Sequence, residues 1–200
     1  MIVPPLKLGF LASGNGSSAR AVVAAIRAGE LAAEARLLVS NNRSAPALAF
    51  AAEAGVPALC IATQADPGAA DRKLADAMTA RGVEVVVLSG YLRQLGPQTL
   101  ARYAGRILNI HPGPLPAFGG HGMYGRRVHE AVVAAGVAES GICIHLVDEE
   151  YDRGPVIARR AVAVEPGETA ESLEARVTAL EPQFYVETLG KIAEGAISLP

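Results

Sequence analysis

Five almost wholly apolar runs mark the first half of the chain, at 6–12, 35–40, 57–62, 83–90 and 105–111. Helix-like segments separate these runs. A run that is apolar at nearly every position is typical of a strand buried on both faces of a parallel sheet. Strand–helix alternation with such short connections predicts right-handed βαβ units. The pattern therefore predicts an α/β fold with a doubly wound, mostly parallel, Rossmann-like sheet.

The residues between the runs predict where the helices lie, because proline marks helix starts and glycine marks helix ends. The expected helices are Ser17–Gly29, Pro46–Gly55, Asp71–Gly82 and a short one after Pro97. The later elements are a Gly/Pro-rich loop, a helix, two antiparallel strands and a closing helix, at 112–125, 126–136, 140–148, 154–164 and Thr169–Gly190. Pro182 is expected to kink or split the closing helix. We expect one domain, 1–200.

Composition and charge exclude several classes of protein. Half of the 200 residues are apolar and 19% are charged, which allows a full core. The net charge is −2 with no basic stripe, so no nucleic-acid partner is expected. No apolar run approaches the ~20 residues of a membrane span. The N-terminus lacks the charged start of a signal peptide, and we expect a cytoplasmic protein.

The two cysteines, Cys60 and Cys143, each lie within an apolar run. They are far apart in the sequence and form no CxxC pair, and HExxH spacing is absent as well. This usage is typical of buried thiols in a reducing compartment. We therefore expect neither a disulfide nor a structural metal.

The loop after the first strand reads "SGNGSS" (13–18). Gly14 and Gly16 permit a tight turn, and Ser17 or Ser18 can cap the helix that follows. The helix start offers unpaired N–H groups and a positive dipole end, which suit a phosphate. The loop is neither GxGxxG nor a Walker loop. The residues alone leave two interpretations open, a phosphate site and an ordinary capped turn.

The stretch "RILNIHPGPLP" (106–116) carries a polar pair at the end of an apolar strand. Asn109 and His111 are two residues apart, so on a strand they point to the same side. An Asn amide can donate to a carbonyl oxygen that gains charge, and a His can pass a proton near neutral pH. The pair indicates an acyl- or proton-transfer site. The alternative is a polar strand end satisfied by backbone contacts.

The turn "DEEYDRGP" (148–155) holds four carboxylates in five positions. One of them could orient a histidine, but spacing does not say which. The other histidines carry weaker signals. His145, within an apolar strand, is expected to be a satisfied core residue, and His129 lies mid-helix. His121 either lines a site or is exposed.

These segments together resemble the folate-dependent glycinamide ribonucleotide (GAR) transformylases. The resemblance covers nearly the whole chain and rests on "SGNGSS", "VVVLSGYLRQL" (85–95), "YAGRILNIHPGPLP" (103–116) and "DEEYDRGPVI" (148–157). It implies transfer of a formyl group from 10-formyltetrahydrofolate to the amine of GAR, in de novo purine (IMP) biosynthesis. It implies no metal. Small molecules are the expected partners, and the chain is expected to be a monomer or a homodimer.

The resemblance also implies roles for particular residues. Asn109, His111 and Asp152 form the catalytic trio, and Asp152 is expected to raise the pKa of His111. The expected GAR contacts are Gly16, Ser17 and Ser18 at the phosphate and Glu181 at the sugar and amide end. The expected folate contacts are Leu92, Arg93, Gln94, Leu95, Asn109, Glu149, Glu150 and Tyr151. A phosphate-binding half (1–111) would precede a folate-binding half (112–200), with a cis bond at Leu115–Pro116.

Three positions depart from the family pattern. Ser18 stands where Asn is frequent, and Pro182 stands where His is common. The segment "ADPGAADRKL" has no Arg before Arg72, so no residue is assigned to the glutamate tail of the folate.

Four alternatives belong to neighbouring classes. Transfer to methionyl-tRNA usually requires an RNA-binding domain and a basic surface, and hydrolysis of formyl-folate usually comes with a regulatory domain. Neither feature is expected here. Formylation of an amino sugar and a non-catalytic phosphate- or nucleotide-binding module stay open.

Overall fold

The computed structural model describes residues 4–200; residues 1–3, part of the stretch compared above with a signal peptide, lie outside the described range. A single seven-stranded sheet runs through the molecule in the order β3-β2-β1-β4-β5-β6-β7. Its strands are β1 (Leu6–Leu11), β2 (Ala33–Ser40), β3 (Ala58–Cys60), β4 (Val85–Leu88), β5 (Ile107–His111), β6 (Glu139–Leu146) and β7 (Val156–Ala163). Neighbouring strands from β3 to β5 are parallel, whereas β6 and β7 are each antiparallel to the strand before them. The predicted fold class is confirmed.

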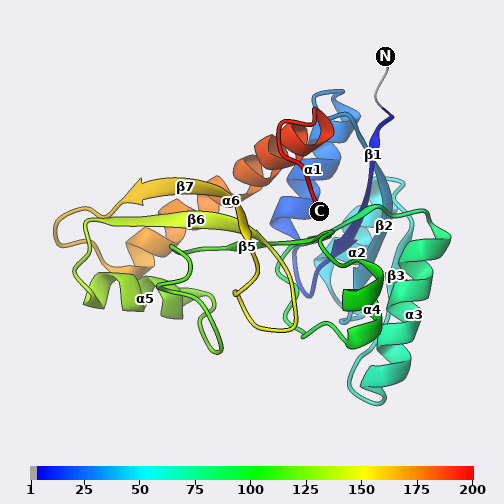
Figure 1. Cartoon of the computed structure of the whole chain (residues 1–200), viewed down its shortest axis with the longest axis horizontal. Helices are drawn as coiled ribbons and strands as arrows, with labels where there is room; N and C mark the ends of the chain where they lie inside the picture. Colours follow the sequence, from blue (N-terminus) through cyan, green and yellow to red (C-terminus); the bar gives the residue numbers. More distant parts are fainter. Residues whose placement is uncertain (1–3) are drawn as a thin grey trace.

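Within the described range, six helices cover the two faces of the sheet. They are α1 (Ser17–Arg27), α2 (Pro46–Glu53), α3 (Pro67–Ala80), α4 (Pro97–Arg102), α5 (Arg126–Ala134) and α6 (Ala170–Ala193). One apolar cluster joins the sheet to α1, α2, α5 and α6, and a second joins it to α3. In Figure 1, β6, β7 and α5 extend away from the N-terminal strands, with α6 running behind the sheet. The loops at the carboxyl ends of β4 and β5 therefore lie between two parts of the molecule.

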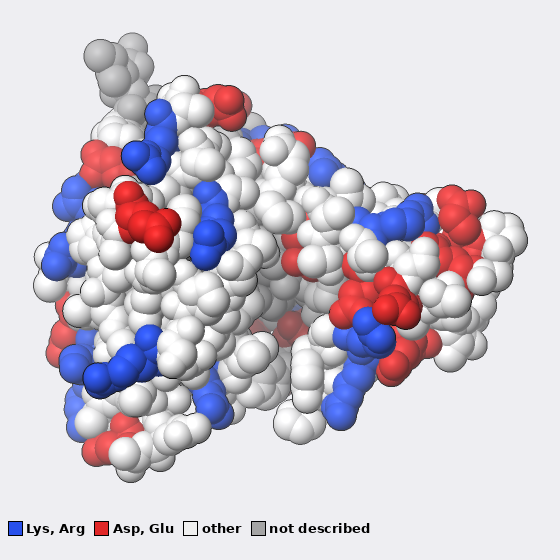
Figure 2. All heavy atoms as spheres, turned by 180° about the vertical axis from the view of Figure 1, so that it is seen from behind, with Lys and Arg blue, Asp and Glu red and all other residues white. Residues whose placement is uncertain are grey.

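The charges are dispersed over the surface. Figure 2 shows Lys and Arg interspersed with Asp and Glu on one face, which is hollowed between a broader and a narrower part. No helix within residues 4–200 is long and apolar enough to cross a membrane. Both cysteines are free thiols; Cys143 is buried as predicted, but Cys60 on the edge strand β3 is only half-buried.

The helix expected to begin at Asp71 begins earlier, at Pro67. Asp66 caps it, because its side chain accepts the Ala69 N–H at 2.8 Å. Asp71 is buried within the helix, where its carboxylate accepts the Thr99 hydroxyl at 2.6 Å. The predicted start was therefore wrong: Asp71 links α3 to α4 and does not begin α3.

Pro182 was expected to kink or split the last helix; the predicted split was wrong, since α6 runs unbroken from Ala170 to Ala193. Proline removes one intrahelical hydrogen bond. Phe184, Tyr185 and Leu189, just beyond it, are buried in the core, and the Tyr185 hydroxyl donates to the Leu108 carbonyl at 2.8 Å. This burial stabilises the helix enough to offset the missing bond.

Candidate active site

One strand end and one turn bring the expected trio together. Asn109 and His111 lie on β5, and Asp152 lies between β6 and β7. His111 Nδ1 is 3.5 Å from Asp152 Oδ2, and His111 Nε2 is 2.7 Å from the Phe118 carbonyl oxygen. A carbonyl oxygen only accepts, so Nε2 carries the hydrogen of the neutral ring. Nδ1 is then the nitrogen that is free to take a proton.

Burial lowers the pKa of His111 below its usual value of 6.5. The charge of Asp152 and the hydrogen bond with the Phe118 carbonyl both raise this pKa, but burial outweighs them. The expected contribution of Asp152, which raises this pKa, is therefore confirmed, and burial is the larger effect. At neutral pH and without a ligand, His111 is a neutral imidazole.

A fourth residue, His145 of β6, joins this group. It is the cross-strand partner of Asn109, and its Nε2 lies 3.1 Å from Asn109 Nδ2 and 3.4 Å from Asp152 Oδ1. Its Nδ1 donates to the Leu146 carbonyl at 2.9 Å. With its hydrogen on Nδ1, the ring accepts a hydrogen from the Asn109 amide at Nε2. His145 is buried and satisfied as predicted, and it also orients two members of the trio.

The sequence did not predict that His145 contacts Asn109 and Asp152. The residue stands alone in an apolar strand, so the sequence offers no local signal beyond its type. Its place beside Asn109 depends on the register between β5 and β6, which the sequence pattern does not reveal.

Asp152 is held by backbone as well as by side chains. Burial alone would raise the pKa of its carboxyl, but hydrogen bonding with His145, the charge of His111 and the Gly120 N–H hold that pKa below its usual value. The Gly120 N–H donates to Oδ2 at 3.0 Å. Asp152 has a left-handed φ of 56°, which Asp tolerates better than most residues. The carboxylate therefore stays ionised and fixed.

Gly154, two residues further on, is required by close packing. A Cβ atom there would lie 1.9 Å from the Leu146 carbonyl oxygen. We expect Gly154→Ala to lower the free energy of unfolding by about 1–3 kcal/mol or more, because rigid backbone must move. Urea unfolding would measure this. Gly190→Ala is the control: it lies within α6 with no atom within 4 Å of a new Cβ, so it should be neutral or stabilising. Equal stability of both variants would contradict the packing argument.

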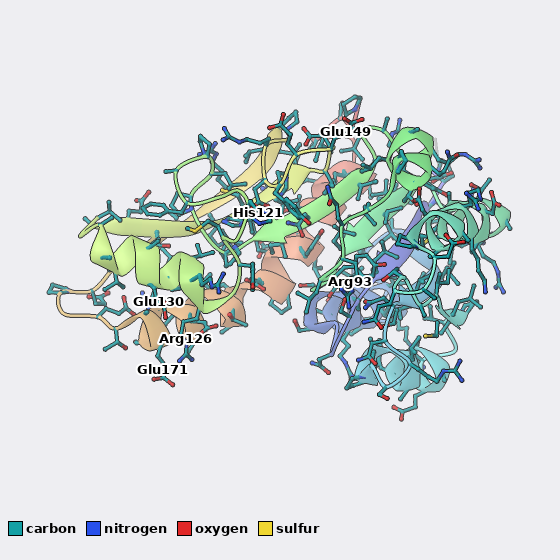
Figure 3. The ribbon with its side chains drawn as sticks, turned by 90° about the horizontal axis from the view of Figure 1, so that it is seen from below. Arg93, His121, Arg126, Glu130, Glu149 and Glu171 are labelled. Atoms are coloured by element: carbon teal, nitrogen blue, oxygen red, sulfur yellow. The ribbon has the colours of Figure 1, made fainter. Side chains whose placement is uncertain are left out.

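Two hollows that share lining residues border the trio. The smaller, of about 100 Å³, is lined by Asn109 and by the expected folate contacts Arg93, Gln94, Leu95, Glu149, Glu150 and Tyr151. The larger, of about 710 Å³, is lined by Asn109, His111, Asp152 and Glu181. Leu92 lines only the larger cavity and is 74% exposed. His121 lines it too, with its ring edge-on to Tyr151, and Figure 3 shows His121 and Arg93 coming from different loops.

Glu181 stands in the wall of the larger cavity on α6. Burial raises the pKa of its carboxyl to about 7. At neutral pH the group is therefore present in both forms, and can donate a hydrogen bond as well as accept one. The structure brings Glu181 and the trio to one cavity.

The loop 13–18 lies outside the lining of both cavities. Gly16 is the N-cap of α1 with a left-handed φ of 65°, and no side chain caps this helix. The expectation that Ser17 or Ser18 caps α1 was therefore wrong. The Ala19 N–H donates to Ser89 Oγ at 3.0 Å. The Ser17 and Ser18 N–H groups are the first of the helix, which leaves this end open to an anion.

Ser13 connects this loop to the loop after β4. Its hydroxyl donates to Asn41 Oδ1 at 2.5 Å and accepts the Leu92 N–H at 2.8 Å. The Gly/Pro-rich loop (112–125) is joined to β5 by the hydrogen bond between the Phe118 carbonyl and His111 Nε2. This loop contains the predicted cis bond at Leu115–Pro116.

The fold and this site together define a class of protein. The chain belongs to the formyl transferase family, whose sequence model it matches over residues 6–189. The family expected from the motifs is thereby confirmed.

Within this family the chain is similar to phosphoribosylglycinamide formyltransferases. It is 38% identical to the chloroplastic enzyme of Arabidopsis thaliana over 96% of this chain and 66% of that protein. It is 34% identical to the enzyme of Escherichia coli over 94% of this chain and 88% of that protein. A crystal structure of glycinamide ribonucleotide transformylase 1 from Symbiobacterium toebii superposes with a TM-score of 0.87, at 33% identity, covering 98% and 91% of the two chains. The chain thus spans about two thirds of the length of the chloroplastic relative.

Proposed function

We propose that this protein transfers the formyl group of 10-formyltetrahydrofolate to the primary amine of GAR, as a step of purine biosynthesis. The observation that carries the proposal is the meeting of Asn109, His111 and Asp152 at one cavity, in a chain whose relatives bear this activity in their names. The volume of this cavity, about 710 Å³, lies within the range of pockets that bind small molecules.

The chemistry follows from the protonation states. The amine nitrogen attacks the formyl carbon, and the formyl oxygen gains negative charge. Asn109 donates to this oxygen through the amide N–H that is not directed at His145. Neutral His111 takes a proton from the amine as the new C–N bond forms. It becomes a cation beside ionised Asp152, which stabilises it.

The second half of the reaction returns this proton. The bond between the formyl carbon and the folate nitrogen breaks, and that nitrogen receives the proton from cationic His111. One C–N bond forms and one breaks, and His111 ends neutral as it began. A ring whose pKa lies below its usual value suits this order of events, because it starts as a base.

The substrates are placed by two groups of residues. The open start of α1 at Gly16, Ser17 and Ser18 supports a site for the GAR phosphate. Glu181 supports contact with the ribose, since its carboxyl can both donate and accept. The smaller cavity supports a slot for the folate pterin, lined by Leu95, Arg93, Gln94 and the turn at 149–151, and Leu92 lines the neighbouring larger cavity.

We expect Ser17→Asp to raise the KM for GAR at least tenfold with little change in kcat. The new carboxylate would stand at the first turn of α1 and repel the phosphate by more than 1.4 kcal/mol at short range. Steady-state kinetics at two ionic strengths would measure this, because salt should weaken the effect. Ser17→Asn, of similar size without the charge, is the control. An unchanged KM in Ser17→Asp would place the phosphate elsewhere.

The direct test follows the absorbance of a 10-formylfolate analogue as it loses its formyl group. Transfer requires GAR, so the signal should appear only when GAR is present. Turnover without GAR would indicate a hydrolase, and turnover only with an amino sugar would indicate a different acceptor. Tight binding of GAR without any turnover would indicate a binding module.

A further inference from the structure

A buried histidine of α5 borders the larger cavity and has no part in the chemistry above. His129 is 1% exposed and lines this cavity. Its Nδ1 is fully buried and has no hydrogen-bond partner among residues 4–200. Buried polar atoms are nearly always paired, because a bare one costs folding free energy. His129 carries this cost in the wall of the cavity, which favours a functional use of its other ring nitrogen, Nε2, over a purely structural role.

The acidic residue that acts on the pKa of His129, Glu174, is already paired with an arginine. Glu174 of α6 acts on the pKa of His129, but its Oε2 accepts the Arg126 Nε–H at 2.7 Å. Arg126 also lies 3.8 Å from Glu171, and Figure 3 shows these two side chains together where α5 and α6 meet. His111 also acts on the pKa of His129, which it lowers. His129 is therefore within electrostatic reach of the proton-carrying histidine and is not paired with Glu174.

The form of the His129 ring follows from its surroundings. Burial lowers its pKa, so the ring is neutral at neutral pH and has one N–H. Buried N–H groups without an acceptor are rarer than acceptors without a donor. The hydrogen is therefore better placed on Nε2, with the sealed Nδ1 left bare. The ring then offers the cavity one N–H donor.

The wall beside His129 is polar along one stripe of α6. Glu174, Thr178 and Glu181 are spaced by four and three residues, which puts them on one face of the helix, and all three line the cavity. A hydroxyl, a carboxyl of mixed protonation and a ring N–H together suit a ligand that carries both hydroxyl groups and a carbonyl oxygen. A ribosyl amide has this chemistry.

We propose that His129 is a substrate-binding residue whose Nε2–H donates to an oxygen of the ribosyl glycinamide part of the amine substrate. The contact would hold the amine against His111 and Asp152, which line the same cavity. This inference rests on the proposed function for the identity of the amine substrate.

The test is His129→Leu, with GAR binding measured by calorimetry. Loss of one hydrogen bond should weaken GAR binding about tenfold. The melting temperature should not fall, because leucine is of similar size and removes an unpaired nitrogen. A purely structural His129 predicts the reverse, a lower melting temperature with unchanged affinity for GAR, and that result would overturn the proposal.

Two further variants sharpen the test. His129→Gln keeps an N–H near the place of Nε2 and should recover most of the lost affinity; if it binds no better than the leucine variant, the hydrogen bond is rejected. Glu130→Gln alters the exposed neighbour on the same helix, and its affinity for GAR should match that of the wild type.

A second ligand, ribose 5-phosphate, distinguishes between the two possible acceptors of the hydrogen bond, a sugar hydroxyl and the amide carbonyl. If His129→Leu weakens ribose 5-phosphate as much as GAR, the acceptor is a sugar hydroxyl. If it weakens GAR alone, the acceptor is the amide carbonyl. Unchanged affinity for both ligands overturns the proposal. Formyl transfer by the wild type is measured separately. If the wild type formylates GAR and the leucine variant binds GAR normally, the role of His129 is rejected and the proposed function stands.

Discussion

His111→Ala should bind GAR nearly as well as the wild type and lose about 10²–10⁴-fold in kcat. The variant removes the only ring nitrogen of the trio that is free to take the proton of the attacking amine, Nδ1 beside Asp152. GAR affinity should persist, because the expected phosphate contacts lie on α1 and outside the cavity. Single-turnover formyl transfer and GAR titration would measure the two effects separately.

His111→Gln is the matched variant for this prediction. It keeps a donor toward the Phe118 carbonyl but carries no titratable group, so kcat should fall as far as in the alanine variant. A glutamine variant with near-normal kcat would show that the ring only positions the loop.

The pH dependence of the same reaction follows from the lowered pKa of His111. The proposed mechanism requires the neutral ring, so kcat/KM should be lost as the pH falls through this pKa, which lies below 6.5. Asp152→Asn should move this acidic limb to lower pH, because it removes the charge that raises the pKa. A profile that instead falls as the pH rises through this region would mean that the cation is the active form.

Asn109→Leu should lower kcat by about 10²–10³-fold, the cost of one oxyanion donor. The amide supplies an N–H where the formyl oxygen gains charge, and leucine is of similar volume but supplies none. The KM for GAR should change little, since the ground-state carbonyl requires this donor less than the transition state does. Steady-state kinetics with both substrates varied would show the split.

Asn109→Asp tests whether the N–H matters or only the shape. The carboxylate has nearly the same shape but no hydrogen to donate, so its loss of kcat should equal or exceed that of leucine. Thermal unfolding of both variants controls for the contact with His145. Retention of kcat within a few fold in the aspartate variant would exclude Asn109 as the oxyanion donor.

Much of this fold is readable from local patterns. The uniformly apolar runs predict buried parallel strands because side chains face helices on both sides of the sheet. The start of α3 was predicted less well. The capping residue Asp66, four residues before the first buried residue Ala70, decides where that helix begins. Continuity of α6 through Pro182 was not predictable, because it depends on burial of residues beyond the proline.

The candidate site divides in the same way. The strand period placed Asn109 and His111 on one side, and the motif resemblance singled out Asp152 among its acidic neighbours. The positions of His145 and His129 required tertiary structure, because cross-strand register and helix packing bring distant residues together. The net pKa of His111 also required it, since burial, which the sequence does not show, outweighs the neighbouring carboxylate.

By itself, then, the sequence determined the alternating architecture, the polar pair on β5 and the family, because these depend on period and on residue order. Only the tertiary structure decided which groups surround that pair, which protonation state His111 has at neutral pH, and which buried nitrogen is left unpaired in the cavity wall. Distances and desolvation set these properties, and both arise only when segments far apart in the chain pack against one another.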